Sequence, residues 1–300
     1  MTSTPKPEYE SPTQKLFFPA RKLLISQQNE REAIIRLSRD VTSFSKKVIF
    51  SAHRTLPSLP QSISNQLVVE LIANFKVLAK ALSLIHFQYS HKPNFVNYKP
   101  TISNALEEFI EAVTFGHYLS YRKIMRFLEL LEVLRLLVVS YDDLTQEIND
   151  ARLHYAIQKV FIGFNAEGVL PSVAPETLLV DVFWCSMGDY IMGLLDLSGE
   201  MMRYATVHVK PANDEAEVSS TSLQIFRDLQ ELKAAFDVLA LNNKTLNGIK
   251  SGQFMFSSKA YVNSSWGKKI QVLAQNYLKV EDLICGVCIR GNENYVEEEF

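Results

Sequence analysis

Apolar residues recur at helical spacing along most of the chain, which predicts long amphipathic helices and few strands. From residue 23 to about residue 53 the pattern passes through Ile34, Leu37, Val41 and Val48, with charged residues between them. Apolar positions three and four apart lie on one face of an α-helix. The same spacing predicts further helices over residues 61–88, 103–131, 134–160, 177–207, 222–241 and 266–289.

Proline, glycine and short polar runs separate these periodic segments. Pro57 and Pro60 follow the first predicted helix, Pro93 follows the second, and Pro100 precedes the third. The stretch 163–175, which contains glycine and proline, and the acidic stretch 209–220 are expected to be loops. Only 11 glycines and 11 prolines occur in 300 residues. We therefore predict an all-α fold, an elongated bundle of about seven helices.

The ends of the chain lack the apolar pattern of the centre. Residues 1–20 contain four prolines and no helical period, so we expect a flexible N-terminal arm there. Residues 21–291 are expected to form a single helical domain, followed by a frayed acidic tail over residues 292–300. Several predicted helices have about thirty residues, and their apolar faces are expected to need subunit partners as well as one another.

Composition narrows the class of protein. With 47% hydrophobic residues the chain can bury one sizeable core. Its three cysteines do not suggest a secreted disulfide framework, and Cys285 and Cys288 lie in an apolar run that predicts buried helix packing. The most apolar stretch, 127–139, contains charged residues and is shorter than the ~20 residues that a membrane span needs. We expect a soluble chain without a membrane partner. Its expected location is the cytoplasm, with the nucleus as a second location.

Charge is unevenly distributed along the chain. The formal net charge is −2, yet residues 1–60 carry ten Lys or Arg against five Asp or Glu. These basic residues either form a solvated helix face or contact a nucleic acid. The candidates for RNA contact in this segment are Arg36, Arg39, Lys46, Lys47 and Arg54.

Acidic residues at helical spacing are the candidates for chemistry. Residues three or four apart on a helix share one face, so a pair can present two carboxylates to one cation. Mg²⁺ and Mn²⁺ prefer hard oxygen ligands, and two facing pairs would make a site fit for phosphodiester hydrolysis. Three pairs have this spacing: Glu108 with Glu111, Asp196 with Glu200, and Glu129 with Glu132.

The surroundings separate these pairs. Glu108, Glu111, Asp196 and Glu200 stand in nearly apolar helix segments, where a carboxylate needs a compensating charge. That charge is either a metal ion or an Arg or Lys from another helix. Glu129 and Glu132 alternate with basic residues, which predicts an exposed, ion-paired edge.

Two more side chains adjoin the acidic pairs. His117 follows the first pair and Arg203 follows the second. His117 is either a group that steadies a scissile phosphate or, more simply, a packed core histidine. Arg203 is either such a group or, more simply, a surface arginine. The chain lacks the histidine spacing of a zinc site and the glycine fingerprint of a nucleotide-binding loop.

Two of these segments resemble the translin family. Residues 108–118 (EFIEAVTFGHY) and 189–203 (DYIMGLLDLSGEMMR) look like two strings of that family, in the same order. Similarity extends over residues 30–56, 104–122, 187–206 and 272–291, and is weak over 222–242. The pair Asp196 and Glu200 is similar to the branch of the family that accompanies translin, because translin itself lacks it. Residues 127–180 match poorly, which predicts an insertion within that range.

The resemblance implies a function as well as a fold. It implies a seven-helix, translin-like bundle that assembles with translin into a hetero-oligomer. It implies Mg²⁺-dependent endoribonuclease activity on single-stranded RNA, including passenger-strand fragments of small interfering RNA and fragments from transfer-RNA processing, with DNA as an alternative nucleic acid and Mn²⁺ as an alternative metal. Carried over by position, the catalytic metal ligands would be Glu108, Glu111 and Asp196, with Glu200 as a fourth carboxylate.

A second interpretation keeps the family and drops the chemistry. The chain would then be a non-catalytic helical scaffold that stabilises translin and contributes to nucleic-acid binding, with its carboxylates serving only structure. The two interpretations differ in whether the two acidic pairs converge across adjacent helices or point apart.

Overall fold

The computed structural model describes residues 12–54, 64–162, 164, 180–209, 218–242 and 265–297. The predicted all-α class is confirmed: the described secondary structure is helical apart from one short hairpin. The elements in chain order are α1 (Pro12–His53), α2 (Asn65–Leu84), the π-helix η1 (Ile85–Ser90), α3 (Phe95–Tyr121), α4 (Phe127–Val138), β1 (Tyr141–Asp142), β2 (Glu147–Ile148), α5 (Asp150–Val160), α6 (Met187–Val207), α7 (Ser220–Asn242) and α9 (Ser265–Glu297).

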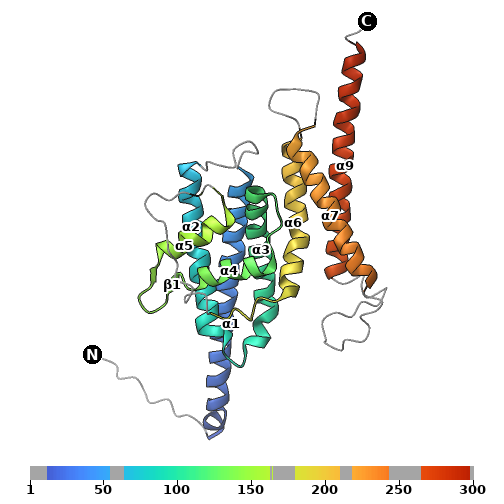
Figure 1. The fold of residues 1–300 in the computed structure, drawn as a ribbon. Helices are drawn as coiled ribbons and strands as arrows, with labels where there is room; N and C mark the ends of the chain where they lie inside the picture. Colours follow the sequence, from blue (N-terminus) through green and yellow to red (C-terminus); the bar gives the residue numbers. More distant parts are fainter. Residues whose placement is uncertain are drawn as a thin grey trace, which may run out of the picture.

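The helices form an elongated bundle in which α1 packs against both α2 and α3 (Figure 1). α3 lies between α1 and α6, α6 also contacts α7 and α9, and α4 and α5 cover α2. The start of α1 and the end of α9 extend beyond the bundle in opposite directions. The buried core follows this order, and α3 contributes much of it, including Phe109, Ile110, Val113 and Phe115.

The third helix differs from the prediction at both ends. α3 begins at Phe95 rather than at residue 103, because the backbone N–H of Phe95 donates to Lys92 and starts a helical turn. Pro100 is therefore inside the helix near its start, where its missing N–H leaves only one hydrogen bond unmade. Arg122 ends α3 in the left-handed conformation, with a φ of 53°. The helix predicted to continue to residue 131 is thus divided.

The helix predicted over residues 134–160 is also wrong as a single element. α4 begins at Phe127, one residue after Arg126, whose N–H donates to the Glu129 carboxylate at 2.8 Å. It ends at Val138, and the antiparallel pair of β1 and β2 separates it from α5. Gln146 takes a positive φ of 56° in the hairpin turn. Helical periodicity did not reveal this turn because apolar residues continue on both sides of it.

Other expected boundaries also shift. α1 begins at Pro12, so residues 12–20 are helical and the expected arm is shorter. α6 begins at Met187 rather than at residue 177, because Ser186 caps it and accepts from the N–H of Asp189 at 3.2 Å. α9 extends to Glu297, beyond the start expected for the tail. Most of the loops expected over residues 163–175 and 209–220 lie outside the described residues, and the predicted insertion and the single domain remain predictions.

Two further expectations concern cysteine and membrane. Cys285 and Cys288 are exposed on α9, so the prediction that they are buried is wrong. Within the apolar run around them, only residues such as Ile284 are buried against the bundle. None of the described helices is long and apolar enough to cross a membrane.

Gly193 sets the distance between α3 and α6. A Cβ at this position would lie 2.6 Å from Cγ2 and 2.7 Å from Cβ of Ile110. Neither atom belongs to the free end of a flexible side chain, so only glycine fits this approach. The contact joins the helix that carries Glu108 and Glu111 to the helix that carries Asp196 and Glu200, and it holds the two helices side by side.

We expect Gly193→Ala to lower the free energy of unfolding by roughly 1–3 kcal/mol, because the added methyl group forces the helices apart. Chemical denaturation of the full chain measures this change. Gly199→Ala is the matched control on the same helix, since its Cβ would meet its nearest neighbour, Asn276 Nδ2, at 3.7 Å. That variant should be neutral or gain up to about 1 kcal/mol from helix propensity. Equal effects of the two variants would contradict the close contact.

Candidate functional site

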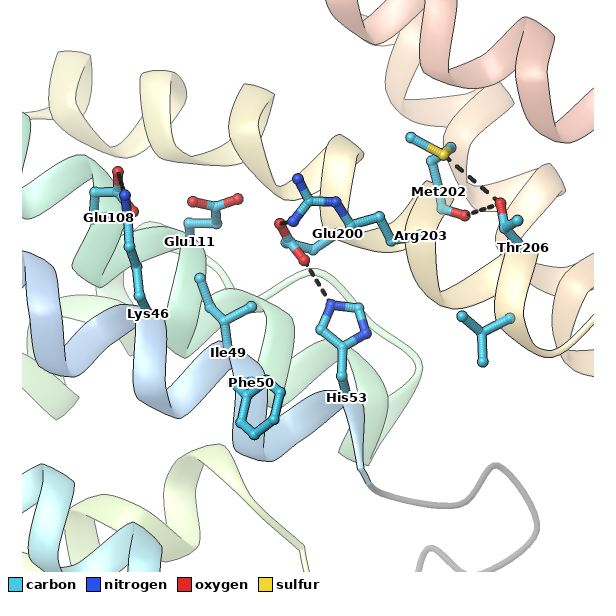
Figure 2. A pocket seen from close by; sticks show the side chains of 11 residues that line it. Lys46, Ile49, Phe50, His53, Glu108, Glu111, Glu200, Met202, Arg203 and Thr206 are labelled. Carbon is cyan, nitrogen blue, oxygen red and sulfur yellow. Dashed lines mark hydrogen bonds and ion pairs between the residues drawn. The ribbon is translucent and has the colours of Figure 1, made fainter.

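A pocket with a volume of about 830 Å³ opens between α1, α3 and α6. Carboxylates from α3 and α6 meet basic side chains of α1 and α6 along its wall (Figure 2). Each acidic residue belongs to one of the two pairs predicted from helical spacing. The polar and charged residues that line it include Lys46, His53, Glu108, Glu111, Glu200 and Arg203.

Helix geometry determines where these carboxylates point. Glu108 and Glu111 are one turn apart on α3, so both face α1 and α6. Glu200 approaches from α6, on the far side of Glu111 from Glu108 (Figure 2). The close contact at Gly193 brings α6 near enough for this arrangement.

Glu111 is the most perturbed carboxylate of the pocket. Burial, and then the charges of Asp196, Glu200 and Glu108, raise its pKa from 4.5 to about 8. Lys269 acts in the opposite direction without reversing the shift. In the described part of the chain, neither an ion pair nor a hydrogen bond engages the Glu111 carboxylate. The site therefore holds more negative charge around Glu111 than its own cations compensate.

The two neighbouring carboxylates in the pocket have cationic partners. Glu108 Oε1 lies 3.2 Å from Lys46 Nζ of α1. Glu200 is buried, and its two oxygens lie 2.6 Å from His53 Nε2 and 2.6 Å from Arg203 Nη1. His53 also packs against the ring of Phe115, with the ring centroids 4.7 Å apart. α1 thus supplies one basic group to each acidic pair.

Asp196 is engaged from a different direction. Its Oδ2 lies 2.5 Å from Nζ of Lys269 on α9, which also lies 2.8 Å from Glu107. Burial disfavours the charge of Lys269, but the hydrogen bonds that it donates to Asp196 and Glu107 outweigh this and raise its pKa. Asp196 is not among the residues that line the pocket. Its charge nevertheless acts on Glu111 more strongly than that of Glu200 or Glu108.

The donor chemistry of this site fits a hard divalent cation. Four carboxylates on α3 and α6 influence one another, and such an ion would neutralise the negative charge that the buried Glu111 acquires when it releases its proton. As the side chains stand, no three acidic, histidine or cysteine groups of the described residues gather closely enough to hold a metal. Glu108, Asp196 and Glu200 would have to leave Lys46, Lys269 and Arg203 to do so. The four predicted metal ligands stay a prediction.

The predicted RNA contacts fall into two groups. Lys46 and Arg203 line the pocket, and Arg39 lines a groove next to it. The other four candidates lie elsewhere. Arg36 donates to the Glu32 carbonyl at 3.4 Å, Lys47 lies over the Phe44 ring, Arg54 is ion-paired with Glu70, and His117 is half-buried against Lys159.

The contacts of His117 agree with the simpler interpretation, in which it is a packed histidine. Its Nδ1 lies 3.2 Å from the Lys159 carbonyl, and its ring packs on Tyr121. Burial lowers its pKa. The third acidic pair is also structural: Glu129 pairs with Arg126 and Glu132 with Lys159 at the surface.

Sequence reasoning missed two residues that contact the predicted carboxylates. His53 contacts Glu200, and Lys269 links Glu107 to Asp196. His53 and Glu200 are 147 positions apart, and Lys269 and Glu107 are 162 apart. Local spacing carries no signal at such separations. The one clue was that His53 closes the basic segment of the first helix.

Comparison with known proteins gives consistent matches. A model of the translin family matches residues 29–291. A Translin-associated protein X from Pongo abelii is 23% identical over 285 residues, which cover 94% of this chain and 81% of the relative. A Translin-associated protein X homolog from Schizosaccharomyces pombe is 32% identical over 107 residues, covering 34% of this chain and 44% of the relative. A solved structure titled apo-NeC3PO is 14% identical with a TM-score of 0.44, covering 94% of this chain and all of that one.

The raised pKa of Glu111 predicts how stability depends on pH without a divalent cation. Because the folded chain holds this proton up to pH about 8 and the unfolded chain only to about 4.5, the contribution of Glu111 to the free energy of unfolding should fall as pH rises between those values. Glu111→Gln should remove this part of the fall, on the order of a few kcal/mol. Denaturation in EDTA across this pH range measures it.

Glu129→Gln is the control, because hydrogen bonds from Arg126 lower the pKa of Glu129. Its contribution has the opposite sign and is lost as pH falls, so the fall above pH about 4.5 should persist in this variant. A Glu111→Gln chain that keeps the wild-type slope would show that Glu111 is not held protonated.

Proposed function

This chain belongs to the translin family, and we propose that it is the metal-dependent endoribonuclease subunit of a hetero-oligomer that it forms with translin. The family predicted from residues 108–118 and 189–203 is thereby confirmed. Relatives named Translin-associated protein X match 94% of the chain, which supports a role beside translin. The proposed metal is Mg²⁺, with Mn²⁺ as the alternative, and the proposed substrate is single-stranded RNA.

The observation that carries the proposal is the state of Glu111. A buried carboxylate without an ion pair or a hydrogen bond, surrounded by three further carboxylates, is costly to the fold. Strongly perturbed groups of this kind cluster at functional sites. A divalent cation would remove the cost, and a structural role alone gives no reason for it.

Each charged group then has a role. Glu108, Glu111, Asp196 and Glu200 would hold the metal, and the bound ion would supply an activated water and stabilise charge on the phosphate. Glu111 must release its proton for this. Lys46 and Arg203 are already at the pocket, so the loss of their carboxylate partners would leave them to bind phosphate oxygens.

His53 is a positioning residue in this proposal. Its Nε2 contacts Glu200 Oε2 at 2.6 Å, and its ring is held between Phe115 and Tyr204. The rotamer of Glu200 therefore depends on α1 as well as α6. This link ties the pocket to the basic segment of α1.

A second candidate is the non-catalytic scaffold. The ion pairs of Glu108, Asp196 and Glu200 favour it, because Lys46, Lys269 and Arg203 already compensate three of the four carboxylates. Neither these pairs nor the scaffold explains why Glu111 has no partner of its own. We therefore prefer the nuclease.

Glu111→Ala should abolish Mg²⁺-dependent cleavage of a labelled single-stranded RNA by the chain co-expressed with translin. The loss should be at least about a hundredfold, because the variant removes the carboxylate at the centre of the cluster. Wild-type cleavage should also stop in EDTA and return with Mg²⁺. Denaturing gels of timed reactions measure the rate.

Glu132→Ala is the matched control, since Glu132 is a carboxylate that pairs with Lys159 away from the pocket. It should cleave at the wild-type rate. Size-exclusion chromatography must show that both variants assemble as the wild type does. Cleavage by assembled Glu111→Ala would show that the assignment of Glu111 is wrong, and no cleavage by the assembled wild type would favour the scaffold.

The requirement for Mg²⁺ should depend on pH in a defined direction. Since the pKa of Glu111 is about 8, a proton competes with the cation below that pH. The Mg²⁺ concentration for half-maximal cleavage should therefore fall as pH rises from about 6 to about 8. Mg²⁺ titrations at several pH values measure it, and a constant requirement would argue against Glu111 as a ligand.

A further inference from the structure

A second depression continues from the acidic pocket along the seam between α1 and α3. It has a volume of about 490 Å³ and shares Lys46 with the pocket. We name it the α1–α3 groove. Its polar lining consists mainly of Arg39, Thr42, Ser43, Lys46, Thr101 and Asn104.

The groove and the pocket have opposite chemistry. Three carboxylates line the pocket, whereas no acidic residue is among the described residues that line the groove. Arg39 is exposed, and within the described ranges it makes no ion pair. The remaining polar groups are hydroxyls and one amide, which both donate and accept hydrogen bonds. The groove therefore suits a ligand that carries negative charge and hydroxyl groups.

Ser38 gives an independent sign of a ligand. It lines the groove and is 4% exposed, and its Oγ has no hydrogen-bond partner. A buried hydroxyl without a partner costs about 1–3 kcal/mol, so such groups are rare in folded proteins. If its side chain rotates toward the groove, a hydroxyl or phosphate oxygen there would provide the missing partner.

We propose that the α1–α3 groove binds the ribose–phosphate backbone of the RNA strand next to the bond that is cleaved. The proposal rests on the proposed function and extends it, because Lys46 stands where the groove meets the acidic pocket. A strand in the groove would lead its next phosphate directly to the carboxylates. Arg39 pairs with a phosphate, and the hydroxyl and amide groups bond to ribose.

The groove recognises backbone rather than base. Its lining contains no aromatic ring among the described residues, so bases have no surface on which to stack. The 2′-hydroxyl is the group by which a protein distinguishes RNA from DNA. Contacts to it through Ser38, Thr42 or Asn104 would favour RNA without a preference for sequence.

Arg39 and Arg36 form a matched pair for the test. Both are exposed arginines on α1, one turn apart, and only Arg39 lines the groove. In the complex with translin, with EDTA to prevent cleavage, Arg39→Ala should raise the Kd for a labelled single-stranded RNA about tenfold. It should also lower the slope of log K against log salt by about one, while Arg36→Ala changes neither.

Ser38 and Ser45 form a second pair. Both are buried serines of α1 whose Oγ has no partner, but only Ser38 lines the groove. Their alanine variants should match in thermal stability, since each removes an unpaired hydroxyl. Ser38→Ala should weaken RNA binding about threefold to fivefold and binding of the same DNA sequence less, and Ser45→Ala should change neither.

The outcomes separate the groove from the nuclease. Equal RNA affinities within either pair overturn the groove, even if the wild type cleaves RNA. Weaker binding by Arg39→Ala and Ser38→Ala supports the groove, even if the wild type does not cleave. If these variants instead fail to assemble with translin in size-exclusion chromatography, the groove is a protein interface and the proposal is wrong. Equal weakening for RNA and DNA by Ser38→Ala overturns the contact with the 2′-hydroxyl.

Discussion

The close approach of α3 and α6 at Gly193 is the constraint on which the rest of the structure depends. Because a methyl group at this position would overlap Ile110, the two helices approach more closely than larger side chains would allow. Both acidic pairs are on these helices. Their crowding therefore follows from backbone packing, and the basic residues of α1 and α9 are arranged around carboxylates that the packing has already brought together.

That crowding creates a problem of charge that the chain solves only in part. Lys46, Arg203 and Lys269 each pair with one of the four predicted ligands, Lys269 also pairs with Glu107, and the three cations come from three different helices. Buried charges are tolerated when they are paired, and a buried carboxylate without a partner retains its proton instead. Glu111 is in this state. The fold thus supports a carboxylate that gains most from a cation supplied from outside.

The sequence predicted the helical class and the two acidic pairs, because both depend on local spacing. Periodicity placed α2, α7 and most of α1 and α9 well, since apolar residues repeat along those parts of the chain. It missed the break at Arg122, where the chain turns through a left-handed residue without a glycine to mark it. It also missed His53 and Lys269, because their contacts with Glu200 and Asp196 depend on which helices pack together.

The same limit explains why the sequence treated the basic residues of α1 as one set. On a helix, residues three apart differ by about 60° in direction, so Arg36 and Arg39 need not face the same neighbour. Once α3 lies beside α1, Arg39 and Lys46 follow the seam between them, while Lys47 lies over Phe44. α1 therefore presents positive charge along one line that ends at the carboxylates. A polyanion following that line meets attraction first and the acidic pocket last, and its phosphate can approach those carboxylates only with a cation between them.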